Sequence, residues 1–244
     1  MTIPPVAIIT GAGSGIGRAC ALRLAACGFR LTLIGRTSET LEETLTEIAA
    51  QVDDAKDVLI LPTDLADAEQ AQSVVDLTVE RWGRLDAIVN NAGMAELHDI
   101  DETTIERLHE SFAINTFAPA LLIARGWKAL LRSADGTLTS GPCVVNVTTM
   151  GTLRPSPGFF IYAAAKCAAE SFVRSIANEG GEDGLRAYAV APGAVETKML
   201  RGLFDESMLS SENTLDPDEV AALIEACIMG ERSEPNGAVI PIQR

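Results

Sequence analysis

The sequence has little of what metal sites and disulfide frameworks require. Two of its 244 residues are histidine and five are cysteine, and no C-x-x-C or comparable ligand spacing occurs. Cysteines that are odd in number and scattered along the chain are typical of buried free thiols in a reducing compartment. We therefore expect no metal site and no disulfide framework.

Long apolar runs are missing as well. The apolar stretch at residues 6–9 is interrupted by Thr10 and Gly11, and no basic segment precedes it. No segment approaches the roughly 20 apolar residues that a membrane-spanning helix needs. These features predict a cytoplasmic protein without a membrane anchor.

Positive charge and aromatic residues are scarce. There are 19 Lys and Arg against 34 Asp and Glu, for a formal net charge of −15. An acidic surface repels phosphate backbones and anionic lipids, so neither nucleic acid nor a membrane is expected as a partner. Aromatic residues make up 5% of the chain and apolar residues 47%, so the core must be largely aliphatic, as in helices packed on a parallel sheet.

What is present is an alternation of strand-length apolar runs with longer amphipathic stretches. The predicted strands are residues 6–10, 30–35, 57–62, 86–90, 143–148, 186–191 and 238–241. The predicted helices are residues 16–27, 38–52, 68–82, 103–133, 160–179 and 217–229. Pro119 interrupts the helix at 103–133, which is therefore two helices or one bent helix. The alternation predicts a doubly wound, Rossmann-type α/β fold, with a predominantly parallel seven-stranded sheet, helices on both faces and a single domain over residues 1–244.

Residues 196–215 break this alternation. They follow the sixth predicted strand and show only weak periodicity. Long excursions beyond the carboxyl ends of parallel strands commonly form lids or substrate walls. We expect this segment to be a substrate-binding loop or lid.

A glycine-rich turn connects the first predicted strand to the first helix. Gly11, Gly15 and Gly17 fit the spacing G-x-x-x-G-x-G, whereas G-x-G-x-x-G fails because Ile16 holds its sixth position. Glycines let the backbone approach a ligand closely, and the helix start directs free N–H groups at a diphosphate. The position favours a dinucleotide site over a merely structural turn, with Ser14 and Ile16 as further contacts.

The end of the second predicted strand favours NADP(H) over NAD(H). An acidic residue here would hydrogen-bond the adenosine ribose and favour NAD(H). Instead Arg36 can bind a 2′-phosphate, Thr37 and Ser38 add hydroxyls, and Arg18 adds positive charge nearby. The alternative is a solvent-exposed Arg36, with Glu39 reaching the ribose.

Tyr162 and Lys166 form a Y-x-x-x-K pair in a predicted helix, so they lie one turn apart on the same face. A phenol is a poor base near neutral pH, and a nearby ammonium stabilises its ionised form. Tyr162 is therefore a candidate general acid/base, and Lys166 can also bind the nicotinamide ribose. The spacing alone is common in ordinary surface pairs.

The motifs together resemble those of the short-chain dehydrogenase/reductase family, in its compact single-domain branch. They are T-G-x-x-x-G-I-G at residues 10–17, N-N-A-G at 90–93, Y-x-x-x-K at 162–166 and P-G-x-V-x-T at 192–197. Each falls in the order and on the element that the family requires, and the match covers nearly the whole chain.

The resemblance implies roles for further residues. Asp64 would contact the adenine, and Asn115 would hold a water that links Lys166 to solvent for proton relay. Pro192 and the residues after it would face the nicotinamide and bind its carboxamide. The implied cofactor contacts beyond the glycine turn are Arg36, Thr37, Asp64, Leu65, Asn91, Ala92, Gly93, Tyr162, Lys166, Pro192, Gly193, Val195 and Thr197.

One position departs from the family pattern. The family usually has a serine thirteen residues before the tyrosine, where this chain has Thr149. Threonine keeps the hydroxyl but adds a methyl group and stiffer χ1 preferences. We expect Thr149 to hydrogen-bond the substrate oxygen, with Thr148, one position out of register, as the alternative.

The substrate and the oligomer are indicated only in outline. Apolar side chains expected near the reacting end indicate an apolar ketone, aldehyde or secondary alcohol, or a carrier-bound acyl chain. They are Met94, Leu97, Leu153, Phe159, Met199, Leu203 and Phe204. Arg154 and Arg201 are the candidates for binding a carboxylate. The apolar surplus of residues 116–131 and 160–176, with the resemblance, indicates a homodimer or homotetramer.

The sequence thus predicts an oxidoreductase that transfers a hydride between NADP(H) and a carbonyl or alcohol, with Asn115, Thr149, Tyr162 and Lys166 as its catalytic residues. One alternative is an NADP(H)-binding sensor or scaffold without turnover, which could lose these four residues and keep the glycine turn. Another is an NAD-linked alcohol dehydrogenase, which shares the site and differs around Arg36.

Overall fold

The computed structural model describes residues 3–52 and 57–244. Its centre is a seven-stranded sheet in the order β3-β2-β1-β4-β5-β6-β7, in which every neighbouring pair is parallel. The strands are β1 (Val6–Thr10), β2 (Arg30–Gly35), β3 (Val58–Pro62), β4 (Ala87–Asn90), β5 (Cys143–Val147), β6 (Arg186–Pro192) and β7 (Val239–Ile242). The predicted strands agree with these to within two residues at each end.

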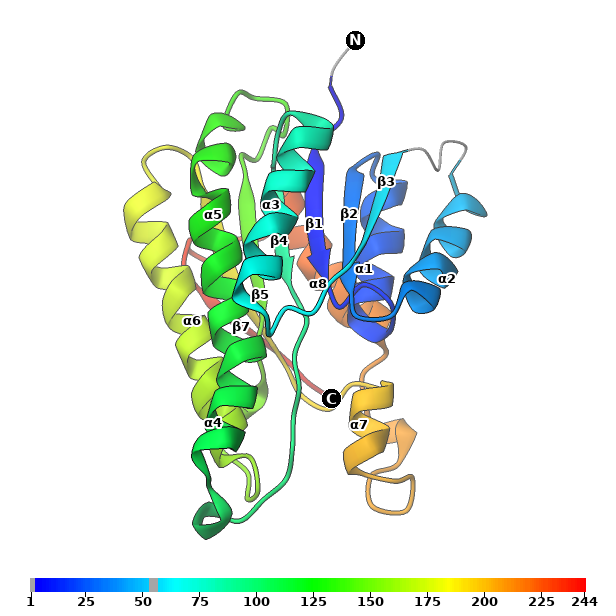
Figure 1. Ribbon diagram of the computed structural model, residues 1–244, viewed down its shortest axis with the longest axis vertical. Helices are drawn as coiled ribbons and strands as arrows, with labels where there is room; N and C mark the ends of the chain where they lie inside the picture. The colour runs from blue at the N-terminus through cyan, green and yellow to red at the C-terminus, as the bar shows by residue number, and fades with distance from the viewer. Residues whose placement is uncertain (1–2, 53–56) are drawn as a thin grey trace.

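Helices cover both faces of the sheet (Figure 1). On one face lie α1 (Gly15–Ala26), α2 (Ser38–Ala49) and α8 (Pro217–Met229), and on the other lie α3 (Ala68–Trp82), α5 (Ala118–Arg132) and α6 (Phe160–Gly180). Each group of helices packs its aliphatic side chains on one face of the sheet. Successive side chains of a strand point alternately into the two resulting cores. The predicted doubly wound fold is confirmed.

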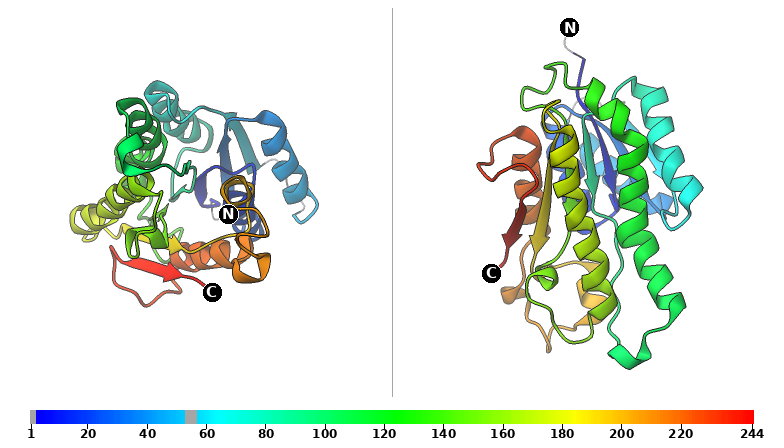
Figure 2. Two further views of the ribbon diagram at one scale, coloured as in Figure 1. Left: turned by 90° about the horizontal axis from the view of Figure 1, so that it is seen from below. Right: turned by 90° about the vertical axis from the view of Figure 1, so that its left-hand side faces the viewer.

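The segment predicted as a helix at 103–133 is one helical run with a change of pitch. It consists of α4 (Ile105–Phe112), a π-helical turn η3 (Ala113–Phe117) and α5. Pro119 has no N–H to donate to the carbonyl four residues earlier, so the hydrogen-bond ladder must rearrange near this point. Figure 2 (right) shows α5 running beside α6 on the same face of the sheet.

The sheet has two chemically different ends. At the amino end, the buried Asp86 accepts hydrogen bonds from Val6 N (2.8 Å) and from the Arg84 guanidinium (2.7 Å). At the carboxyl end, the strand order reverses between β1 and β4, which is where ligands bind in open α/β sheets. The helix α7 (Lys198–Leu203) lies beyond this end (Figure 1).

Within residues 3–52 and 57–244, no helix is both long and apolar enough to cross a membrane. The same ranges contain no cluster of three or more His, Cys, Asp or Glu side chains that could hold a metal ion.

Candidate active site

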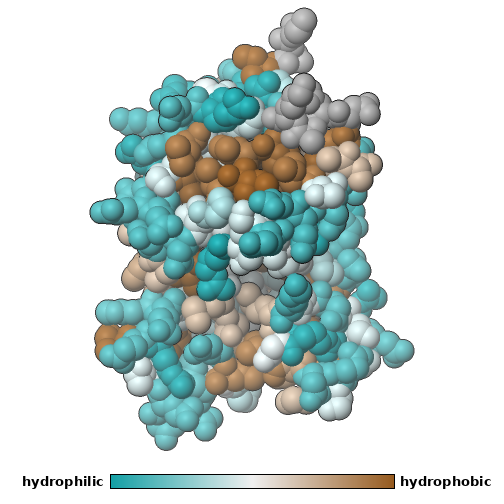
Figure 3. Space-filling view, turned by 45° about the vertical axis from the view of Figure 1, so that its right-hand side comes forward, coloured by the Kyte–Doolittle hydropathy of each residue, from teal (hydrophilic) through white to brown (hydrophobic). Residues whose placement is uncertain are grey.

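A cleft of about 1250 Å³ opens at the carboxyl end of the sheet. Figure 3 shows the surface hollowed at about half height, between the body of the sheet and the lower part that holds α7. The volume exceeds the roughly 300–1,000 Å³ of a typical small-molecule site, so a dinucleotide and a second small molecule fit together. The walls come from the segments after all seven strands, because parallel strands end at one edge.

Nearly all of the predicted site residues line this cleft. They are Gly11, Ser14, Gly15, Ile16, Arg36, Thr37, Asp64, Leu65, Asn91, Ala92, Gly93, Thr149, Tyr162, Lys166, Pro192, Gly193, Val195 and Thr197. Two predicted residues, Gly17 and Asn115, lie behind the wall. Both contact residues that form the cleft.

Gly17 shapes the glycine turn from behind. A Cβ atom at Gly17 would lie 2.2 Å from the Gly11 carbonyl oxygen and 2.6 Å from Asn91 Nδ2. Asn91 in turn donates to the Thr10 carbonyl (2.9 Å) and holds the exit of β1. The turn is thus packed tightly against β4, and only glycine fits at this position.

The front of the same turn is suited to a diphosphate. Ser14 is the N-cap of α1 and makes no side-chain capping bond. The N–H groups of the first turn of a helix have no partner within the helix and carry partial positive charge. These donors line the cleft, so the turn fits the phosphates of a dinucleotide.

Arg18 and Arg36 have different environments. Arg18 forms ion pairs with Glu43 and Glu47, both at 2.7 Å, and donates to the Gly13 carbonyl at 2.7 Å. It does not line the cleft; it lies behind the glycine turn, as a brace whose charge is paired with the two glutamates. Arg36 is exposed and lines the cleft, and none of the ion pairs in the described part of the chain involves it.

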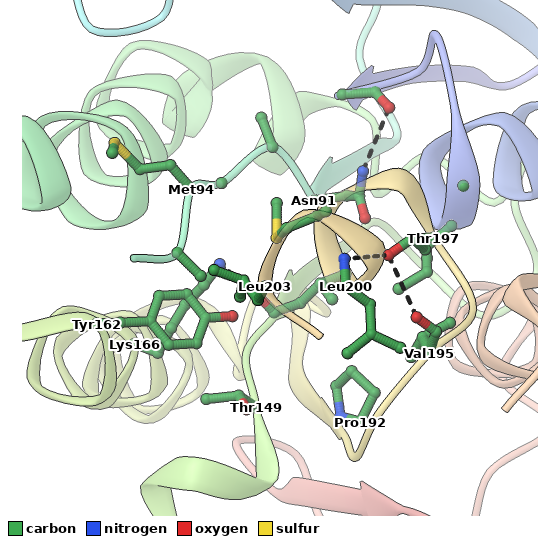
Figure 4. A pocket seen from close by; sticks show the side chains of 18 of the residues that line it. Asn91, Met94, Thr149, Tyr162, Lys166, Pro192, Val195, Thr197, Leu200 and Leu203 are labelled. Atoms are coloured by element: carbon green, nitrogen blue, oxygen red, sulfur yellow. Dashed lines mark hydrogen bonds between the residues drawn. The ribbon is translucent and has the colours of Figure 1, made fainter. Parts of the chain in front are cut away.

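Tyr162 and Lys166 project from α6 on the opposite wall. Figure 4 shows the Tyr162 hydroxyl pointing into the cleft, with Lys166 beside the ring and Thr149 on the adjoining wall. Burial raises the pKa of Tyr162 to about 12, and the hydroxyl of Thr149 only partly opposes this. Lys166 does not offset the burial, because its Nζ donates to the Val147 carbonyl (2.9 Å) and lies 5.9 Å from the ring centroid.

Lys166 lies in a tightly packed environment. Its side chain is 4% exposed, and burial lowers its pKa to about 8 because an ammonium loses hydration there. A Cβ atom at Gly93 would lie 3.2 Å from Lys166 Nζ and 2.7 Å from Asn115 Oδ1. The glycine after β4 thus makes room for both side chains.

Asn115 lies in the π-helical turn and is fully buried. Its Oδ1 accepts from Met94 N (3.2 Å), and its Nδ2 donates to the Met94 carbonyl (2.9 Å) and to Ser111 Oγ (3.3 Å). The side chain therefore fixes the segment after β4. A π-helical turn is often found at functional sites, and here it brings this amide opposite Met94.

The two candidate threonines point in different directions. Thr149 Oγ1 accepts from Gly151 N (3.1 Å), which leaves its own proton free toward the cleft. The hydroxyl of Thr148 donates to Glu170 Oε1 (3.1 Å) and lies 3.3 Å from the Val190 carbonyl. The alternative of Thr148 as the substrate-binding hydroxyl is thus disfavoured.

The substrate end of the cleft differs in part from prediction. Met94, Phe159, Met199, Leu203 and Phe204 line it as expected. Leu97 and Leu153 are instead largely exposed and do not line it. Arg201 is also excluded, because ion pairs with Glu196 and Glu206 hold it within residues 196–215.

Several lining residues were missed. They are Gly13, Thr40, Thr63, Ala66, Ala95, Glu110, Ile114, Met150, Lys198, Leu200, Leu209 and Gln243, among others. Gln243 follows β7, the parallel neighbour of β6, so its place at the carboxyl edge could have been inferred from the strand order. Arg154, the other candidate for a carboxylate, does line the cleft.

The fold and the cleft define an enzyme of the dinucleotide-binding α/β class. The sequence model of the family described as short chain dehydrogenase matches residues 5–207. Levodione reductase of Leifsonia aquatica is 32% identical over 254 residues, covering 97% of this chain and 92% of that protein.

Solved structures agree with this match. The crystal structure of levodione reductase has a TM-score of 0.87 at 31% identity and covers 98% of this chain and 96% of that one. An alcohol dehydrogenase from the archaeon Thermococcus sibiricus, complexed with 5-hydroxy-NADP, has a TM-score of 0.82 at 25% identity, with coverage of 98% and 96%. The chain belongs to the short-chain dehydrogenase/reductase family, and is an oxidoreductase that acts on carbonyl or alcohol groups with a nicotinamide cofactor.

Proposed function

We propose that the protein is an NADP(H)-dependent reductase of an apolar ketone or aldehyde, with Tyr162 as the general acid. The supporting observation is the half-buried phenol of Tyr162, whose hydroxyl points into the cleft. A pKa near 12 keeps this phenol protonated at neutral pH. A protonated phenol can donate to a developing alkoxide, which suits the direction of carbonyl reduction.

In this mechanism the substrate oxygen lies between two hydroxyls. Thr149 and Tyr162 both donate to it, which orients the carbonyl and favours charge on its oxygen. When bound, the nicotinamide would supply the hydride to the carbonyl carbon. Tyr162 passes its proton to the oxygen, and the phenolate that is left regains a proton from solvent by way of Lys166. Asn115 keeps the adjoining segment in place through its two bonds to Met94.

Removing the phenol hydroxyl tests this assignment. Tyr162→Phe is expected to lower kcat by roughly 10²- to 10⁴-fold, the usual contribution of a positioned acid, with little change in the Kd of NADPH. The assay follows oxidation of NADPH across ketones and aldehydes of graded chain length. Ser171→Ala, at an exposed position on the same helix, is the control. Near-normal turnover in Tyr162→Phe would remove the role proposed for this residue.

The same assay separates the reductase from a sensor or scaffold. A sensor would bind NADPH, as seen by fluorescence, and oxidise it with none of the carbonyls. The presence of Tyr162, Lys166 and the Thr149 hydroxyl on two adjoining walls of the cleft favours turnover.

The preference for NADP(H) rests on Arg36. It is the exposed guanidinium where the adenosine end would lie, whereas Glu39 does not line the cleft. The related alcohol dehydrogenase was solved with 5-hydroxy-NADP. Losing a hydrogen bond to a charged group costs about 1.5–3 kcal/mol, so Arg36→Asp is expected to lower kcat/KM for NADPH by roughly 10- to 100-fold. Arg174→Asp on α6 is the control, and an unchanged NADPH/NADH ratio in Arg36→Asp would refute the assignment.

Residues 196–215 are proposed to act as the substrate lid of a single domain. The segment contains α7 and η5 (Ser211–Asn213) and is held together by Arg201, which donates to Glu196 and to the Leu209 carbonyl (2.7 Å). Its Leu200, Leu203 and Phe204 face the cleft and favour an apolar substrate.

We further propose a homodimer or homotetramer in the cytoplasm. Phe117, on the turn before α5, is 52% exposed, and Phe160, at the start of α6, is 51% exposed. Large apolar side chains left in water on neighbouring helices favour a contact with a second copy of the chain. Sedimentation velocity would measure the oligomer directly, and a monomer at micromolar concentration would contradict this part of the proposal.

A further inference from the structure

Glu170 lies on α6 one turn after Lys166 and two turns after Tyr162, so the three side chains share one face of the helix. Its side chain is 6% exposed, although no ion pair in the described part of the chain compensates its charge. A buried carboxylate without hydrogen-bond donors is costly. The groups that donate hydrogen bonds to Glu170 therefore indicate which part of the structure its carboxylate stabilises.

Those donors are the hydroxyls of Thr148 and Thr152, at 3.1 and 2.5 Å from the same oxygen, Glu170 Oε1. The two threonines flank Thr149 in sequence. Thr148 also donates its backbone N–H to the Val190 carbonyl (2.7 Å), and the Thr152 hydroxyl lies 2.8 Å from the Thr149 carbonyl. Hydrogen bonds to an ionised carboxylate are shorter and stronger than neutral ones, so this contact is stiff.

We propose that Glu170 is a positioning residue for Thr149. By holding the residues on both sides of Thr149, its carboxylate fixes the backbone from which that hydroxyl points into the cleft. The phenol of Tyr162 is placed by α6 directly, and the hydroxyl of Thr149 is placed by the same helix through Glu170. This inference rests on the proposed function, because it assigns a partner to the hydroxyl used there.

A double-mutant cycle between Glu170 and Thr149 tests it. Glu170→Leu is expected to lower kcat about tenfold with an unchanged Kd of NADPH. In a Thr149→Ala background, the same substitution is expected to lower kcat less than twofold further, because the hydroxyl it would misplace is gone. Glu170→Gln, whose amide oxygen still accepts a hydrogen bond, is expected to retain most of kcat. Glu179→Leu, at an exposed position of the same helix, is the control.

The outcomes separate the two proposals. A tenfold loss from Glu170→Leu in both backgrounds would show that Glu170 acts only on the fold, and an unchanged kcat in the wild-type background would also overturn the inference. A normal kcat in Thr149→Ala alone would refute the role of that hydroxyl in the reaction, and the inference with it. If Glu170→Leu does not fold, as judged by NADPH binding, Glu170→Asp replaces it in the cycle. The side chain of Asp is one methylene shorter, so its carboxylate cannot accept hydrogen bonds from both threonines in their present positions.

Discussion

Replacing Lys166 with Met is expected to change the pH dependence of folding in a defined window. In the folded protein, burial lowers the pKa of Lys166 from its ordinary 10.5 to about 8. Between these two values the unfolded chain holds a proton that the folded chain has released. Stability therefore rises with pH through this window, and below about pH 8 the folded protein carries the full cost of a buried ammonium.

The size of the effect follows from the two pKa values. A difference of 2.5 between 10.5 and about 8 corresponds to about 3.4 kcal/mol, at 1.36 kcal/mol per pKa unit. Part of the cost of burying the Lys166 ammonium remains at pH 10. The contribution of Lys166 to the free energy of unfolding should therefore rise by about 2.5 kcal/mol between pH 7 and pH 10. Met has a similar length and no charge, so Lys166→Met removes this dependence.

The quantity to measure is the free energy of unfolding in urea for both proteins at several pH values. Burial raises the pKa of Cys20, Cys143 and Cys227 and of Tyr162, so the folded protein keeps their protons and loses stability at high pH. These groups are common to both proteins and cancel in the difference, wild type minus Lys166→Met. That difference should rise by about 2.5 kcal/mol between pH 7 and pH 10.

A matched control uses Lys128→Met, at an exposed position of α5. It makes the same substitution away from the cleft, so a rise of the same size in its difference from the wild type would show that the effect does not come from the buried site. A wild type minus Lys166→Met difference that is flat or falls between pH 7 and pH 10 would refute the reasoning.

Three further substitutions probe the frame of the site. In Gly17→Ala the new methyl group would lie 2.2 Å from a carbonyl oxygen of the turn, so we expect about 1–3 kcal/mol of destabilisation and weaker NADPH binding. The control is Gly202→Ala, whose new methyl group would have no atom within 4 Å and should change neither stability nor NADPH binding. Asp86→Ala removes the fully buried carboxylate that pairs with Arg84 and accepts from Val6 N, and leaves Arg84 only the more exposed Asp135; a loss of about 3–5 kcal/mol is expected in urea unfolding, and a loss below 1 kcal/mol would contradict this. Arg201→Met removes the ion pairs within the proposed lid, so we expect a raised KM for the carbonyl at an unchanged Kd for NADPH, and an unchanged KM would argue against a lid.

The sheet could be predicted because each strand is a short apolar run, and the strands at the centre of the sheet are buried on both faces. All five residues of β1 and of β5 are buried, for example, and each run is followed by a turn and a helix. The order of such units fixes which turns meet at the carboxyl edge. That rule predicts the glycine turn at the carboxyl edge, and the resemblance to the short-chain dehydrogenase/reductase family added the segment after β4 and Tyr162 to the same site.

Side-chain directions within that frame could not be predicted in the same way. Arg18 and Arg201 were expected to offer positive charge to ligands, but each is held by two glutamates from the same or a neighbouring segment. Leu97 was expected in the cleft, yet it packs against Gly158. Glu170 appears in the sequence as an ordinary charged residue of a helix, and only the packing of α6 on β5 brings it to the threonines.

The 21 residues of α6 form one uninterrupted helix that carries both Tyr162 and Lys166. Because a helix moves as a unit, opening or closing of the cleft would leave the spacing between phenol and ammonium unchanged. The walls that select a substrate come largely from other segments, chiefly the one after β6. Changes in that outer segment can thus reshape the cleft without altering the spacing of Tyr162 and Lys166.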